Sequence, residues 1–152
     1  MSNEASATPA GRILRVGLAA GLLMNLVGWV GNQLVLGPLW KDAIRTVVPL
    51  RNRTWINELL SLVPDFIYGI AIAWLYVELA RSRGPGLGTA IIAALVVWAV
   101  TVVPTYLGIA NSGLLPVGLA AATTVVGVVS AIPTGWLVWK WLDTKGPAPW
   151  AA

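Results

Sequence analysis

The sequence predicts an all-α integral membrane protein, a four-helix bundle with a short amphipathic surface helix between spans one and two. Of the 152 residues, 57% are hydrophobic and 11% are charged, whereas soluble domains carry about 25% charged residues. The mean hydropathy is +0.78, and residues 84–139 include no charged residue. About four spans of roughly 20 residues each fit a chain of this length, so we expect one compact bundle.

The expected organisation is one membrane domain between two polar tails. Residues 1–11 are small and polar, with too little apolar surface to fold alone, and residues 143–152 form the second tail. The membrane domain covers residues 12–142. Its spans are expected at about 13–39, 56–80, 88–107 and 115–141.

The first span follows Arg12 and Arg15 and contains the uncharged run 16–40. This run is longer than the apolar core of a secretory signal, and no small-x-small cleavage site follows a short core. We therefore expect it to be retained as a span.

The surface helix is expected at residues 40–48, where the pattern changes. Apolar residues recur there at i, i+3, i+4, i+7 and i+8, with charged and polar residues between them, which is typical of an amphipathic helix. Such a helix lies flat on a membrane, and Pro49 ends it. The alternative is an amphipathic loop that packs on the end of the bundle.

Glycine and proline separate the remaining spans. The second span ends at the sequence RSRGPG, residues 81–86, because its glycines and proline do not continue a helix. The uncharged stretch that follows is too long for one crossing. Four residues mark a tight turn within it: Gly108, Asn111, Gly113 and Pro116.

Orientation follows from the distribution of lysine and arginine. With the N-terminus in the cytoplasm, six of these residues lie inside and four lie outside, as the positive-inside rule requires. Both termini are then cytoplasmic. Tryptophans fall near both interfaces, where their rings prefer to lie: Trp40 and Trp55 outside, and Trp136, Trp139 and Trp141 inside.

Composition also excludes several chemistries. The chain has no cysteine and no histidine, so disulfides, thiolate metal sites, histidine-ligated haem and ordinary zinc sites are not expected. We expect no cofactor and no metal. The net charge of +4 is explained by membrane topology, so nucleic acid is not an expected partner.

Two spans carry stripes of small and weakly polar residues. Gly17, Gly21, Asn25, Gly28 and Asn32 share one face of the first span. Thr123, Gly127, Ser130 and Thr134 share one face of the fourth. Such stripes are usually helix-packing faces, but the two asparagine amides demand more hydrogen bonding than packing requires.

The second span carries the sharper signal, Asp65. It shares a face with Glu58, Ser61 and Tyr68, and Pro64 loosens the helix beside it. An aspartate deep in a membrane costs about 2.5–3.5 kcal/mol on insertion scales and often has a function. The structural alternative is that Asp65 is shallow enough to reach water, Arg51 or Arg53. Glu78 is expected to pair with Arg81 near the inner interface.

If the polar faces converge, they line a cleft in the outer half of the membrane. Pro104 would widen its opening, and apolar walls with a few convergent polar groups are typical of small-molecule sites. The candidate ligand-binding residues are Asn25, Trp29, Asn32, Asp65, Tyr68, Trp98, Thr101 and Thr105.

Several segments resemble a group of uncharacterised bacterial four-span inner-membrane proteins. The resemblance lies at residues 68–69, 74–76, 81–86, 89–90 and Trp98. It implies a four-helix fold and a bacterial inner membrane, and it implies no activity and no catalytic residue.

Three functions remain open. The first is binding of an apolar or amphipathic small molecule, or of a partner membrane protein, in the cleft near Asp65. The second is a metal-independent isomerase or cyclase acting on an isoprenoid-like substrate, with Asp65 as acid or base and Tyr68 or Tyr106 as hydrogen-bond donor. The third is a scaffold subunit, which predicts no converging cleft. The bilayer is a partner in each case, and a homo-oligomer is compatible with each.

Overall fold

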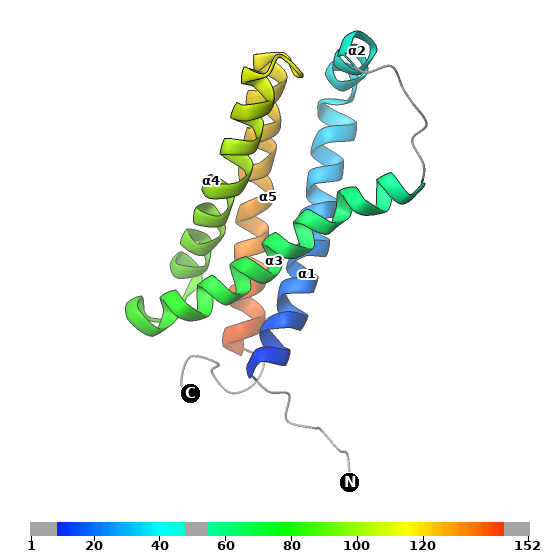
Figure 1. Cartoon of the computed structure of the whole chain (residues 1–152). Helices are drawn as coiled ribbons and strands as arrows, with labels where there is room; N and C mark the ends of the chain where they lie inside the picture. The colour runs from blue at the N-terminus through cyan, green and yellow to red at the C-terminus, as the bar shows by residue number, and fades with distance from the viewer. Residues whose placement is uncertain (1–8, 48–54, 145–152) are drawn as a thin grey trace.

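The computed structural model of the chain describes the backbone of residues 9–47 and 55–144, and the side chains of all of these except 44–47, 57 and 58 (Figure 1). This part of the chain is helical, with short turns and no strand. Its elements are α1 (Pro9–Trp29), the π-helix η1 (Val30–Val35), α2 (Gly37–Val47), α3 (Trp55–Arg83), α4 (Leu87–Asn111) and α5 (Val117–Thr144).

Four helical segments are long and apolar enough to cross a membrane. They are Pro9–Val35, which joins α1 and η1, and Leu59–Arg83, Leu87–Asn111 and Val117–Thr144. The predicted fold class, an all-α membrane bundle of four helices, is therefore confirmed. Many large hydrophobic side chains are exposed, namely leucines, isoleucines, valines and tryptophans, as expected for helices whose outer faces contact lipid.

The helices extend beyond the predicted spans at several ends. Helix α1 begins at Pro9, inside the predicted polar tail, because proline is well suited to the first position of a helix. Helix α4 continues through Pro104 and Gly108 to Asn111. The turn that follows contains Gly113, which has a φ of 74°, a conformation that glycine adopts without strain.

The first span ends earlier than predicted, and the surface helix begins earlier. A π-helical segment follows Trp29, and its last hydrogen bond runs from the Leu36 N–H to the Gly31 carbonyl. Helix α2 then starts at Gly37, three residues before the predicted start. The Trp40 indole N–H donates to Oδ1 of Asn32 at 3.1 Å, so α2 is tied to the end of η1.

Glycines hold α1 and α3 in close contact. A methyl group on Gly69 of α3 would lie 2.3 Å from the Gly17 carbonyl oxygen and 2.3 Å from the Gly21 nitrogen of α1. Gly17 and Gly21 form a small-xxx-small pair, which lets helix backbones approach closely in membranes. Figure 1 shows α3 lying obliquely across α1 rather than along it.

The end of the bundle that holds Pro9 and Thr144 is joined by polar contacts. The buried Tyr76 hydroxyl donates to the Asp143 carboxylate and accepts a hydrogen bond from the Gly86 N–H at 3.2 Å. An Arg12 guanidinium nitrogen donates to the Trp141 and Leu142 carbonyl oxygens at 2.9 and 2.8 Å. The predicted ion pair between Arg81 and Glu78 is confirmed at 2.8 Å.

Candidate functional site

The opposite half of the bundle contains an open cleft of about 420 Å³. This volume lies within the range of about 300–1,000 Å³ that small-molecule sites occupy. Every spanning helix contributes to its lining: Met24, Asn25, Gly28, Trp29 and Asn32 from the first; Ser61, Leu62, Pro64, Asp65 and Tyr68 from α3; Val102, Thr105 and Tyr106 from α4; and Thr123, Val126, Gly127 and Ser130 from α5.

The cleft exists because the helices separate beyond the glycine crossing. Helices α1 and α3 are in backbone contact at Gly17, Gly21 and Gly69. On the other side, η1 packs tightly on α5, where a methyl group on Gly31 would lie 2.6 Å from a Val126 methyl carbon. The space between these two contacts, bounded by α3 and α4, is the cleft.

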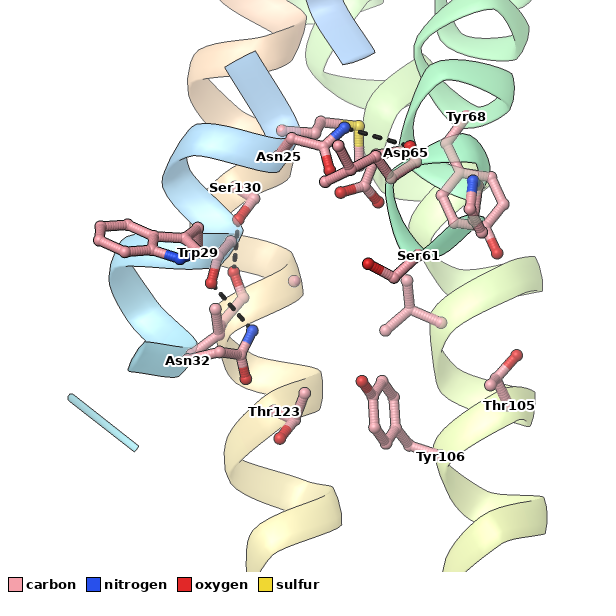
Figure 2. Close-up of a pocket in the computed structure, with 17 residues that line it drawn as sticks. Asn25, Trp29, Asn32, Ser61, Asp65, Tyr68, Thr105, Tyr106, Thr123 and Ser130 are labelled. Carbon is pink, nitrogen blue, oxygen red and sulfur yellow. Dashed lines mark hydrogen bonds between the residues drawn. The ribbon is translucent and has the colours of Figure 1, made fainter. Parts of the chain in front are cut away.

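Asp65 is the charged residue of this lining. Its side chain is half-buried, and Figure 2 shows its carboxylate directed into the space between the helices. Within the described part of the chain, no hydrogen bond or ion pair reaches this carboxylate. Arg51 and Arg53, the alternative partners considered from the sequence, lie outside the described residues.

Asn25 and Asn32 of the first span each donate to a backbone carbonyl of their own segment and also bond to another helix. Nδ2 of Asn25 donates to the Gly21 carbonyl at 3.1 Å in its own helix and to the Leu62 carbonyl of α3 at 3.2 Å. It therefore joins the two helices at the wall of the cleft. Nδ2 of Asn32 donates to the Gly28 carbonyl at 2.9 Å, while its oxygen accepts from Trp40.

Three aromatic residues also line the cleft. Trp29, Tyr68 and Tyr106 line the cleft from three different helices. In Figure 2 the Tyr106 hydroxyl points from α4 into the space that Asp65 also faces. The apolar part of the lining comes from Met24, Leu62, Val102 and Val126.

The structure brings most of the sequence-predicted site residues together. Asn25, Trp29, Asn32, Asp65, Tyr68 and Thr105, and the candidate hydrogen-bond donor Tyr106, all line the cleft. Trp98 and Thr101 are not part of the lining. The Trp98 indole donates to the Thr124 carbonyl at 3.1 Å and packs on Gly127, while the Thr101 hydroxyl donates to the Val97 carbonyl at 2.6 Å.

Sequence reasoning missed the contribution of α5. Thr123, Gly127 and Ser130 line the cleft, although their stripe predicts only a packing face. These residues recur every three to four positions, as the small and polar residues of the first span do. That shared spacing was the available signal, because the stripe on the first span lines the opposite wall of the cleft.

Within the described residues, no group of three or more carboxylate, histidine or cysteine side chains is placed to hold a metal ion. Comparison with protein families, with curated proteins and with solved structures finds no match to this chain. The geometry of the cleft is therefore the observation from which a function is inferred.

Proposed function

We propose that this small polytopic membrane protein binds an apolar or amphipathic small molecule in the cleft at Asp65. The observation that carries the proposal is the convergence of four helices on one cleft, with apolar walls and a few polar side chains. This combination is typical of ligand sites. It favours a small-molecule binder over a scaffold subunit, which has no need of such a lining.

The proposed setting is a bacterial inner membrane, with both termini in the cytoplasm. The contact between Arg12 of α1 and the end of α5 supports placing both chain ends on one side. Reporter fusions after Ala152 and near Asn111 should then report opposite sides of the membrane. The same side for both fusions would contradict the four-span arrangement.

Gly28 offers a direct test of ligand binding. It lines the cleft, and a Cβ added there would meet no atom within 4 Å. Gly28→Leu therefore places a larger apolar side chain at the cleft from a position where its Cβ has room. Gly108→Leu is a matched control, because Gly108 is also helical and open but lies outside the lining.

Native mass spectrometry of the detergent-purified protein measures the effect. We expect wild type and Gly108→Leu to retain a small lipophile, and Gly28→Leu to lose it while keeping the same helix content by circular dichroism. Equal retention by all three proteins, or retention by none, would contradict binding in this cleft.

A second function, metal-independent acid–base catalysis on an isoprenoid-like substrate, is favoured by one feature. The Asp65 carboxylate and the Tyr106 hydroxyl face the same space (Figure 2), as general acid–base catalysis requires. If the protein protonates an alkene, geranylgeraniol incubated with it in D2O should gain deuterium at carbon. Asp65→Asn should abolish this gain, and no gain with wild type would exclude catalysis on that substrate.

A further inference from the structure

Several of the hydrogen-bond donors of the cleft are used within the protein. Both bonds that Asn25 donates through Nδ2 end on backbone carbonyls, and Nδ2 of Asn32 also donates to a carbonyl. The hydroxyls of Thr105, Thr123 and Ser130 each donate to the carbonyl four residues earlier, at 2.7, 2.9 and 3.0 Å. The donors of the lining that make no hydrogen bond to a described residue are the Tyr68 and Tyr106 hydroxyls and the Trp29 indole N–H.

Several acceptors of the same lining are open. The Asp65 carboxylate has no hydrogen bond or ion pair from the described residues, and hydroxyl oxygens that donate to carbonyls keep their own lone pairs. The residues of the lining include no lysine and no arginine. The cleft thus has a negative charge that no cationic side chain of the lining offsets, and a positively charged ligand would complement it.

The aromatic rings fit a positive charge as well. A cation within about 6 Å of the face of a tryptophan or tyrosine ring is attracted by the ring, and the attraction grows when water is excluded. Trp29, Tyr68 and Tyr106 supply three aromatic rings to the lining. In Figure 2 Tyr106 lies across the space from Asp65, whereas the Trp29 indole is directed away from it. The apolar walls would contact the rest of the ligand, so charge and hydrophobic surface are recognised together.

We propose that the ligand class of this cleft is the lipophilic cation, a hydrophobic ammonium or phosphonium compound that pairs with the Asp65 carboxylate. This inference rests on the proposed function, because it assumes that the cleft binds a small molecule. A cation of this class neutralises the carboxylate in a low-dielectric setting and needs no donor from the protein.

Three probes of similar shape and different charge test the inference. They are tetraphenylphosphonium, a cation; triphenylmethane, which is neutral; and tetraphenylborate, an anion. Binding is measured by equilibrium dialysis in dodecyl maltoside, with protein-free micelles subtracted. We expect wild type to bind the cation saturably and about tenfold or more tighter than the anion.

Four variants test whether the affinity for the cation depends on the Asp65 carboxylate. Asp65→Asn keeps the shape and removes the charge, so cation affinity should fall about tenfold or more while triphenylmethane still binds. Asp65→Glu should retain the preference for the cation. Glu78→Gln, which removes a carboxylate paired with Arg81 outside the cleft, should leave cation affinity unchanged, and Gly28→Leu should weaken all probes.

The outcomes separate the two proposals. If wild type binds the neutral probe and the cation with equal affinity, or if Asp65→Asn leaves cation affinity unchanged, the cation inference is wrong. The proposal that the cleft binds a small molecule then still stands. If wild type binds none of the probes, both proposals fail. Added dioleoylphosphatidylethanolamine identifies the source of the cation. If this lipid displaces the bound probe, the natural ligand carries a lipid ammonium group, and if it does not, the natural ligand is a free organic cation.

Discussion

Gly69 of α3 lies directly against Gly21 of α1, so that a methyl group on Gly69 would lie 2.3 Å from the Gly21 nitrogen and 2.8 Å from its Cα. Real Cβ atoms do not approach backbone atoms this closely, and the atoms here cannot move aside as a flexible side chain would. The contact fixes where α3 crosses α1. It therefore determines where the helices separate and where the cleft begins.

We expect Gly69→Ala to destabilise the bundle by about 1–3 kcal/mol, because overpacking forces the two backbones apart. Gly108→Ala is the matched control, since a methyl group there meets no atom within 4 Å. Unfolding in mixed micelles of dodecyl maltoside and sodium dodecyl sulfate measures the difference. A Gly69→Ala protein as stable as Gly108→Ala would contradict the close crossing.

Tyr76 is expected to hold the other end of the bundle together. Its buried hydroxyl bonds to Asp143 of α5 and to the Gly86 N–H of the turn between α3 and α4. Tyr76→Phe preserves the ring and loses both bonds, so it should lower the free energy of unfolding by about 1–3 kcal/mol.

A control and a double-mutant cycle isolate this contribution. Tyr68→Phe should change stability by less than about 0.5 kcal/mol, because no hydrogen bond reaches the Tyr68 hydroxyl from the described residues. Combining Tyr76→Phe with Asp143→Asn should cost less than the sum of the two single changes. Strict additivity would mean that the two side chains do not interact.

Arg12 is expected to stabilise the C-terminal end of α5. Its guanidinium donates to two of the last carbonyls of that helix, where a positive charge also interacts favourably with the helix dipole. Arg12→Gln should therefore lower stability by about 1–2 kcal/mol.

Arg15→Gln removes the same charge and is the matched control. Arg15 is exposed, and its Nε donates a 3.4 Å hydrogen bond to the Gly11 carbonyl of its own helix. Its loss should be close to neutral in the same micelle titration. If the two variants lose equal stability, charge alone matters and the contact with α5 does not.

The sequence predicts the number of spans and much of the cleft, because hydropathy and the cost of burying polar groups are local properties. It does not predict which faces meet. Gly69 has no periodic signature on α3, so its contact with Gly17 and Gly21 could not be inferred. Trp98 was placed in the cleft by depth alone, whereas its indole N–H is satisfied by the Thr124 carbonyl.

The π-helix is a further feature that sequence reasoning could not supply. Residues 30–35 contain no proline or charge that would mark a change in helix geometry. Segments of π-helix are rare and often occur at functional sites, and this one contains Asn32 of the cleft lining. Asn32 itself was predicted, because an amide in a span is costly without a partner.

Asp65 should lower the stability of the protein, and this is the sharpest prediction about its role. A carboxylate within a membrane span costs about 2.5–3.5 kcal/mol on insertion scales, and no hydrogen bond or ion pair from the described residues offsets that cost. Replacing Asp65 would lower the stability of the protein if the residue served the structure. Replacing it would raise the stability if the residue served ligand binding, because functional sites retain unfavourable groups.

We therefore expect Asp65→Asn and Asp65→Leu to be at least as stable as wild type in mixed micelles, and to lose cation binding. Asp65→Leu should be the more stable of the two, since an unpaired amide in a span still needs hydrogen bonds. Glu78→Gln should change stability by less than about 1 kcal/mol, as for an exposed ion pair. A loss of stability in both Asp65 variants would instead indicate a structural partner for the carboxylate, and the argument for a binding site at Asp65 would fail with it.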